Sequence, residues 1–357
     1  MKKKIVFSLL IFFGFFFCVE IIARQWISPK KARVHVYSGT KARENWFELK
    51  NYQVSAQYQH RPTGSFSSNM QQPRIAFLGG SSVHGGSNHL SARQEFPALV
   101  GQKMRIQTLN LGNPSLDSHD LSKILTELKL FPMSAWVVYT GHNDFGNTYF
   151  HQRYKGWSST LGAHALVFLQ RLAVYQALQE KLTIPSGNTA KPNPKKQFSG
   201  PYITEDQKIR AQMYFEQNIE HMIHLAKQEE IPIVFVIPIR DLLRAPLGGC
   251  HGEPCALTLY DQGIALREKS EKEAISLLRE ASDADEIPIR TLSSAQEFLR
   301  SQQQTGVYVI DLPKILETEG SLFSSSLFQD HVHLTGEGHQ KVADVVSQAL
   351  SNILERK

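Results

Sequence analysis

Short apolar runs that alternate with helix-length segments limit the folds open to this chain more than any other feature. Five runs have the length and composition of strands, at 75–78, 106–110, 135–139, 233–237 and 307–310. The run at 233–237 is apolar at every position, which is typical of a parallel strand buried on both faces. Because helical segments separate the runs, the sequence predicts an α/β fold. We expect a flavodoxin-like, three-layer α/β/α sandwich with a mainly parallel sheet.

Most segments between these strands have apolar residues at the spacing of an α-helix. Helices are expected over 96–104, 205–230, 257–281, 293–303 and 336–354, and another runs to Leu130 from Ser118 as its N-cap. Two insertions are expected in the domain, near 147–201 and 241–304. The first joins a helix at 163–182 to a stretch at 185–201 that is rich in Pro, Lys, Ser and Asn. It could act as a lid or be a surface excursion without a role in chemistry.

The amino terminus has the composition of a membrane anchor. Three lysines follow Met1, and residues 5–22 are apolar with three exceptions. A run of this length nearly matches a bilayer core, and no small-residue cleavage site follows it closely. We therefore predict a single-pass signal-anchor over 1–25, a stalk or linker over 26–72, and a domain over 73–357. The lysines place that domain on the periplasmic or extracellular side of the cytoplasmic (inner) membrane.

Two other interpretations of the amino terminus remain. A lipoprotein signal would use Cys18, but the bulky phenylalanines before it do not suit lipid attachment. A buried N-terminal helix would be apolar on one stripe, whereas this segment is apolar all round.

The charge balance does not resemble a nucleic-acid footprint. The chain has 39 Lys and Arg mixed with 33 Asp and Glu, a formal net charge of +6. This excess is modest, and no ladder of aromatic residues and arginines accompanies it. We expect no nucleic-acid partner.

Two of the three cysteines lie close together in the sequence. Cys250 and Cys255 flank the tetrapeptide His-Gly-Glu-Pro in a loop rich in Gly and Pro. An exported chain permits a disulfide there. A metal pair is the alternative, although a single Cys-x4-Cys pair supplies only half of a zinc site. We predict a disulfide.

Polar groups suited to acyl transfer stand just past predicted strands, at the sheet edge where α/β folds bind ligands. A serine nucleophile needs a histidine as base and a carboxylate that orients this histidine, and its oxyanion needs fixed hydrogen-bond donors. Ser81 follows a glycine pair, and Asp330 precedes His333 by three residues. These three are the predicted triad. The backbone N–H groups of Ser81 and Ser115 and the Asn143 amide are the predicted oxyanion donors.

Four ordered blocks of the sequence resemble those of the SGNH/GDSL hydrolases. They are Phe77-Leu-Gly-Gly-Ser-Ser82, Asn110-Leu-Gly-Asn-Pro-Ser115, Gly141-His-Asn-Asp144 and Asp330-His-Val-His-Leu-Thr-Gly-Glu-Gly-His339. The resemblance covers about residues 73–350. By position it implies that Ser81 is the nucleophile, Asn143 an oxyanion donor, His333 the general base and Asp330 its orienting partner.

Glycines support these blocks at Gly80, Gly112 and Gly141. Two positions depart from the family pattern: Gly80 stands where the first block usually has an acid, and Ser115 where the second usually has the oxyanion glycine. Neither change removes a required atom, because the acid is not a triad member and Ser115 contributes a backbone N–H.

The expected function is hydrolysis of a carboxylic ester through an acyl-enzyme. Tethered relatives often act on O-acetyl groups of envelope glycans, so the resemblance implies an acetylated carbohydrate as substrate. The alternatives are a lipid esterase or thioesterase, an O-acetyltransferase, and a non-catalytic glycan-binding or assembly protein. No cofactor or metal is expected, because the block order accounts for His333 without making it a metal ligand together with His331 and His339.

Overall fold

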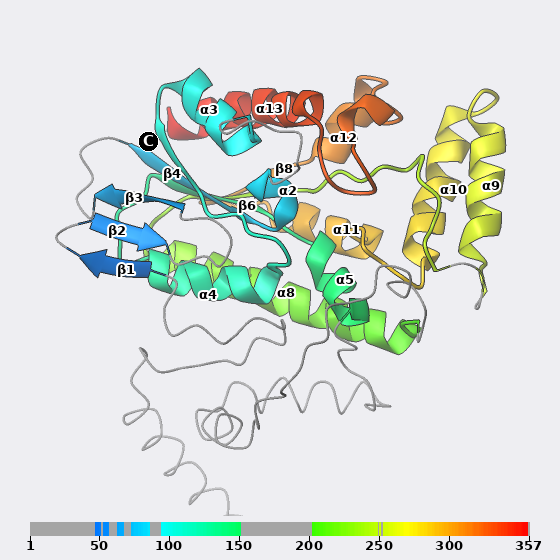
Figure 1. The fold of residues 1–357 in the computed structure, drawn as a ribbon, viewed down its shortest axis with the longest axis horizontal. Coiled ribbons are helices and arrows are strands. Elements are labelled where there is room, and N and C mark those ends of the chain that lie inside the picture. The colour runs from blue at the N-terminus through cyan, green and yellow to red at the C-terminus, as the bar shows by residue number, and fades with distance from the viewer. Residues whose placement is uncertain are drawn as a thin grey trace, which may run out of the picture. The chain divides into compact units, whose positions relative to one another are not determined.

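Five parallel strands form the main sheet of the computed structural model (Figure 1). They are β4 (Arg74–Gly79), β5 (Gln107–Asn110), β6 (Ala135–Tyr139), β7 (Ile233–Val236) and β8 (Val307–Ile310). The strands lie in the order β5-β4-β6-β7-β8. Counted along the chain this is the order of flavodoxin-like sheets, so the predicted α/β class with a parallel sheet is confirmed.

The structure describes residues 47–50, 53–56, 63–67, 73–85, 94–150, 202–248, 250 and 253–355. All of them belong to one unit, made of 45–155 and 195–357. The predicted anchor at 5–22 and the insertion helix and loop at 163–182 and 185–201 lie outside the described residues. Among the helices of the described parts, none has the length and apolar character needed to span a bilayer.

Alternating strand side chains fill two hydrophobic cores, one on each face of the sheet. In β4, Ala76 and Leu78 belong to one core, and Ile75 and Phe77 to the other. The first core is covered by α4 (Ser118–Leu128), α8 (Glu205–Gln228) and α11 (Ser293–Ser301), the second by α3 (Phe96–Met104), α12 (Leu312–Thr318) and α13 (Gly336–Leu354) (Figure 1). Burial on both faces explains why β6 and β7 are apolar throughout, and β4 from Ile75 to Leu78.

The strand order decides where a ligand can bind. The chain crosses from β4 to β5 on one side and from β5 back past β4 to β6 on the other. In open α/β sheets, the crevice at such a switch point, beyond the carboxyl ends of the strands, is the usual binding site. The loops that follow β4, β5 and β6 meet there.

Two helix predictions need correction. Asp117, not Ser118, caps α4, because its carboxylate accepts the backbone N–H of Asp120 at 3.3 Å. The helix predicted over 257–281 is two helices, α9 (Ala256–Leu266) and α10 (Glu271–Ala284), which pack against each other. Ser270 is the N-cap of α10 and separates the two. The charged residues on both helices hid this break in the sequence pattern.

The predicted stalk at 26–72 contains strands that the sequence analysis did not anticipate. Within it, β1 (Phe47–Lys50), β2 (Gln53–Ala56) and β3 (Thr63–Ser67) form an antiparallel sheet. Each strand has only four or five residues. Each also mixes polar with apolar residues, so none forms the apolar run that marked the strands of the main sheet.

The predicted disulfide is present. Cys250 and Cys255 are bonded, with their Cα atoms 4.8 Å apart. Cys255 is also the N-cap of α9. The bond therefore ties the preceding loop to the start of this helix.

Candidate active site

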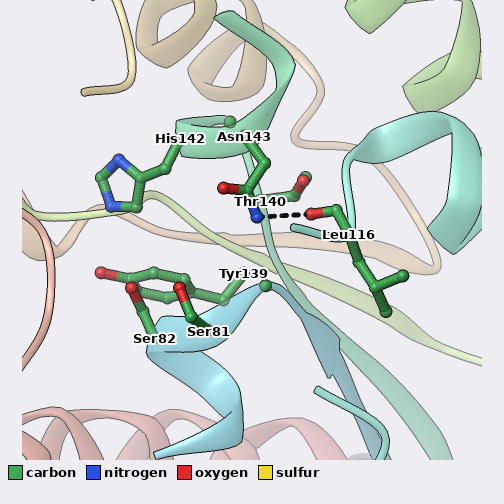
Figure 2. A pocket seen from close by; sticks show the side chains of 9 residues that line it. Ser81, Ser82, Leu116, Tyr139, Thr140, His142 and Asn143 are labelled. Carbon is green, nitrogen blue, oxygen red and sulfur yellow. Dashed lines mark hydrogen bonds between the residues drawn. The ribbon is translucent and has the colours of Figure 1, made fainter. Parts of the chain in front are cut away.

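Ser81 lies where β4 turns sharply into a helix of one turn, α2 (Ser81–His84). The turn needs glycine at position 79, because a Cβ there would lie 2.4 Å from the Tyr139 carbonyl oxygen and 2.2 Å from Val83 Cγ2. Ser81 is the first residue of α2 and is partly exposed, whereas Ser82 is buried. The strand-turn-helix arrangement thus presents the Ser81 hydroxyl at the edge of the sheet (Figure 2).

Three of the predicted residues form a continuous hydrogen-bonded chain. The Ser81 hydroxyl lies 2.7 Å from Nε2 of His333, although the two residues are 252 positions apart. Nδ1 of the same ring lies 2.6 Å from the Asp330 carboxylate. A proton can therefore pass from the hydroxyl to the imidazole while the carboxylate holds the ring.

The Asp330 carboxylate is held in its charged form by the turn that carries it. Its second oxygen accepts the backbone N–H groups of Val332 at 2.9 Å and His333 at 2.8 Å. Burial alone would raise the pKa of Asp330, but the hydrogen bonds from the His333 ring and from the two N–H groups outweigh burial. The pKa of this carboxyl stays well below its usual range.

Asn143 lies in the first turn of α5 (His142–Phe150), directly after β6. The helix begins within the third sequence block, at its second residue. The Asn143 amide donates to the Leu116 carbonyl at 2.7 Å (Figure 2). An amide NH₂ carries two N–H groups, and this contact uses one of them. Within the described residues the other N–H has no acceptor, so it can serve a bound ligand.

Ser115 has a left-handed backbone, with φ of 66°. This conformation explains why a glycine is usual at the position, since a side chain there is strained. Its carbonyl accepts a hydrogen bond of 3.0 Å from Asn147, whose amide also donates to Asp117 at 2.9 Å. Sequence analysis missed Asn147. Its place four residues after Asn143, on the same face of α5, was the available signal.

Replacing Ser115 with glycine should therefore stabilise the protein. The left-handed conformation costs a non-glycine residue roughly 1–2 kcal/mol, and glycine's extra freedom in the unfolded chain offsets roughly 0.5–1 kcal/mol. We expect the free energy of unfolding to rise by about 0.5–1 kcal/mol in Ser115→Gly, measured by urea denaturation. Ser115→Val is the matched control, and it should be destabilised because its branched side chain tolerates this conformation poorly. Equal stability of the two variants would contradict the strain.

The supporting glycines allow close approach between loops. At Gly112 a Cβ would lie 2.5 Å from the His84 backbone nitrogen, so this loop packs directly on α2. Asn110 strengthens the contact by donating to the Val83 carbonyl at 3.0 Å. Gly141 has φ of 128° and lies against Thr291.

Ser82 has a separate, structural role. Its hydroxyl donates to the Val332 carbonyl at 3.1 Å and is buried. This bond ties α2 to the turn that carries Asp330 and His333. Ser81, the predicted nucleophile, is the serine whose hydroxyl faces the imidazole.

Two buried arginines hold together segments near the site: Arg240, just before the insertion at 241–304, and Arg290, within it. Sequence analysis did not identify them. Arg240 donates to the Thr291 carbonyl at 2.7 Å and pairs with Asp283 at 2.7 Å. Arg290, only 2% exposed, donates to the carbonyls of Asp241 at 3.1 Å and Arg244 at 3.0 Å. These contacts join segments that are distant in the sequence, so no local sequence pattern predicts them.

Two buried histidines flank the site and stay neutral. Burial, together with Coulombic contributions from His333 and Arg240, lowers the pKa of His142 to about 3 against weaker opposing effects from Asp330 and the Ile239 backbone. Its Nδ1 accepts the backbone N–H of Thr291 at 3.0 Å. Burial, with a smaller Coulombic contribution from His333, lowers the pKa of His339 to about 4, and its Nδ1 accepts the Phe96 N–H at 3.2 Å.

These two histidines predict how stability depends on pH. In the unfolded chain a histidine binds a proton below about pH 6.5, whereas His142 and His339 resist protonation in the folded state. The unfolded state then binds more protons, so the free energy of unfolding should fall as pH drops from about 6.5 towards 4. Denaturant unfolding at several pH values measures the slope. His339→Asn, which keeps an acceptor for the Phe96 N–H, should reduce that slope by about one proton, or about 1.4 kcal/mol per pH unit. An unchanged slope would contradict this assignment.

The described residues contain no group of three or more His, Cys, Asp or Glu side chains that could hold a metal ion. His331 contacts the Ala245 carbonyl at 3.1 Å through Nε2, and His339 lies stacked on the Phe96 ring. Both side chains therefore have partners within the protein.

No protein-family model matches the chain, and no curated protein matches it. Solved structures do match. A lipolytic protein of the G-D-S-L family from Desulfitobacterium hafniense is 12% identical, with a TM-score of 0.37, over 77% of this chain and 98% of that chain. A lipolytic protein of the same family from Veillonella parvula is 10% identical, with a TM-score of 0.41, over 78% of this chain and 98% of that chain. An acetylxylan esterase from Geobacillus stearothermophilus is 13% identical, with a TM-score of 0.37, over 77% of this chain and 93% of that chain. The first two of these structures bear the name of the G-D-S-L family, the family that the four sequence blocks resemble.

Proposed function

We propose that this protein is a serine ester hydrolase that works through an acyl-enzyme formed on Ser81. The observation that carries the proposal is the hydrogen-bonded chain from the Ser81 hydroxyl through His333 to Asp330, at 2.7 and 2.6 Å. Each contact lies within the range expected for proton transfer to a positioned base. The partly exposed hydroxyl is accessible to a substrate.

In the proposed reaction, the Ser81 oxygen attacks the ester carbonyl carbon and its proton moves to Nε2 of His333. The carbonyl oxygen gains negative charge, and we assign its stabilisation to the backbone N–H groups of Ser81 and Ser115 and the second N–H of Asn143. The bond to the leaving alcohol breaks as His333 returns the proton to it. Water, deprotonated by the same imidazole, then attacks the acyl carbon; the bond to the Ser81 oxygen breaks, the acid leaves, and His333 returns the proton to Ser81.

For the acyl group we propose a short chain, with O-acetyl esters of envelope glycans as the substrate class. A hollow of about 240 Å³, open mouth included, lies beside Ser81, and it is lined by Gly80, Ser81, Ser82, Leu116, Tyr139, Thr140, Gly141, His142 and Asn143 (Figure 2). The centre of a water-sized sphere has only about 10 Å³ of room inside it, roughly enough for one such sphere, so the hollow offers little space to a long acyl chain. The glycan and its envelope location rest on the predicted anchor at 5–22, which would tether the domain outside the cytoplasmic membrane.

Hydrolysis of p-nitrophenyl esters of increasing acyl length tests this proposal. The full-length protein should show its highest kcat/KM with acetate and a fall of about tenfold or more between acetate and octanoate, because roughly 1.4 kcal/mol of lost transition-state binding gives a factor of ten. A preference for octanoate would favour a lipid esterase. Acetyl transfer to an added glycan in excess of hydrolysis would favour an O-acetyltransferase.

A further inference from the structure

We propose that Gly80 is a positioning residue: its missing side chain is what allows the Asn143 amide to lie against the backbone that leads into Ser81. This inference rests on the proposed hydrolase function, in which Asn143 stabilises the oxyanion. Sequence analysis treated Gly80 as a tolerated departure from the usual acid of the first block. The geometry gives the glycine a specific purpose in this chain.

The backbone at position 80 does not itself require glycine. Gly80 is the N-cap of α2, with φ of −82° and ψ of −152°. A negative φ of this size lies in a region open to residues with side chains. Gly85, at the other end of α2, is different, because its φ of 69° favours glycine.

Space, rather than conformation, excludes a side chain at position 80. A Cβ built there would lie 2.2 Å from Nδ2 of Asn143, and its next contacts would be 3.4 Å away. The Asn143 amide is therefore the one group in its way. Because that amide donates to the Leu116 carbonyl at 2.7 Å, pushing it aside would also strain or break the bond that orients it.

The neighbouring glycine shows what a purely structural requirement looks like. At Gly79 a Cβ would meet the Tyr139 backbone oxygen at 2.4 Å and Val83 Cγ2 at 2.2 Å. A β-strand carbonyl cannot move without disturbing the sheet, whereas the end of an asparagine side chain can rotate away. An alanine should therefore reduce stability at position 79 and turnover at position 80.

A displaced amide would weaken the proposed oxyanion site without touching the nucleophile. The contact between Ser81 and His333 involves neither Gly80 nor Asn143. Loss of one oxyanion donor typically costs about 10²–10³ in kcat. Partial displacement should cost less than full removal, with little change in KM.

A double-mutant cycle on the full-length protein tests the inference. We would measure kcat and KM for p-nitrophenyl acetate, and the melting temperature, in Gly80→Ala, Asn143→Ala and the double variant. Gly80→Ala alone should lower kcat by roughly 10- to 100-fold. In the Asn143→Ala background the same change should have almost no effect on kcat, because the displaced group is already gone. Gly146→Ala is the matched control, since its nearest neighbour would be 3.7 Å away, and it should behave as wild type.

The results separate this inference from the proposed function. If Gly80→Ala lowers kcat equally with and without Asn143, or not at all, the inference is wrong while the hydrolase remains. If Gly80→Ala instead unfolds, Asn143→Ala should restore its melting temperature, and failure to do so would also overturn the inference. If wild type and Ser81→Ala hydrolyse the ester equally, the proposed function fails first and the inference fails with it.

Discussion

Ser81→Ala should abolish ester hydrolysis while leaving the melting temperature nearly unchanged. The substitution removes the one hydroxyl that lies 2.7 Å from Nε2 of His333, so no acyl-enzyme can form. Loss of the nucleophile typically costs on the order of 10⁴-fold or more in kcat, with the remainder supplied by the oxyanion site and binding. Ser81 is partly exposed and begins a helix of one turn, so little packing is lost.

The neighbouring serine is a demanding control for this prediction. Ser82→Ala should keep most of the hydrolytic activity, because Ser82 donates to the Val332 carbonyl and does not face the imidazole. It should lower stability by about 1 kcal/mol, since a buried hydrogen bond is lost. Hydrolysis of p-nitrophenyl acetate and thermal melting measure both variants. Activity retained in Ser81→Ala but lost in Ser82→Ala would reverse the assignment of the nucleophile.

Asp330→Asn should reduce kcat by about four orders of magnitude, although the side chain keeps its shape. The oxygen that accepts the N–H groups of Val332 and His333 can be retained as the amide oxygen. The amide nitrogen would then face Nδ1 of His333, where it can only donate. Nδ1 must become the acceptor, so the ring proton moves to Nε2. In that tautomer Nε2 cannot take the proton of Ser81.

A carboxylate outside the site provides the control for Asp330→Asn. Asp311 caps α12 and pairs with Arg300 at 2.6 Å. Asp311→Asn should change stability slightly and leave kcat unaltered. Steady-state hydrolysis of p-nitrophenyl acetate, with circular dichroism to confirm folding, distinguishes the two variants. A loss of less than tenfold in folded Asp330→Asn would remove Asp330 from its proposed role.

The local pattern of the chain was enough to predict the five strands of the main sheet and the residues that follow them. Strands buried on both faces must be apolar, and such runs stand out wherever glycine or a polar turn ends them. Parallel strands bring their carboxyl ends to one edge, so the strand pattern alone places Ser81 and Asn143 near each other. The short turn from Asp330 to His333 could also be predicted, since its parts are only three residues apart.

Contacts between distant segments were beyond that kind of reasoning. The hydrogen bond from Thr291 to His142 spans 149 residues, and Arg240 reaches Thr291 across 51. Asn147 was missed because its partners, the Ser115 carbonyl and Asp117, belong to another loop. The division of 257–281 into α9 and α10 was also missed, since charged residues on two packed helices give no clear period.

The sequence by itself therefore determined the α/β class, the parallel sheet and the residue types at its edge, because burial and turn chemistry act on neighbours along the chain. The tertiary structure alone decided that Ser81 meets His333 while Ser82 meets Val332, and that Gly80 makes room for Asn143. Each of these depends on distances of a few ångströms between segments far apart in sequence. Such distances are set by how the whole sheet and its helices pack, which no local pattern records.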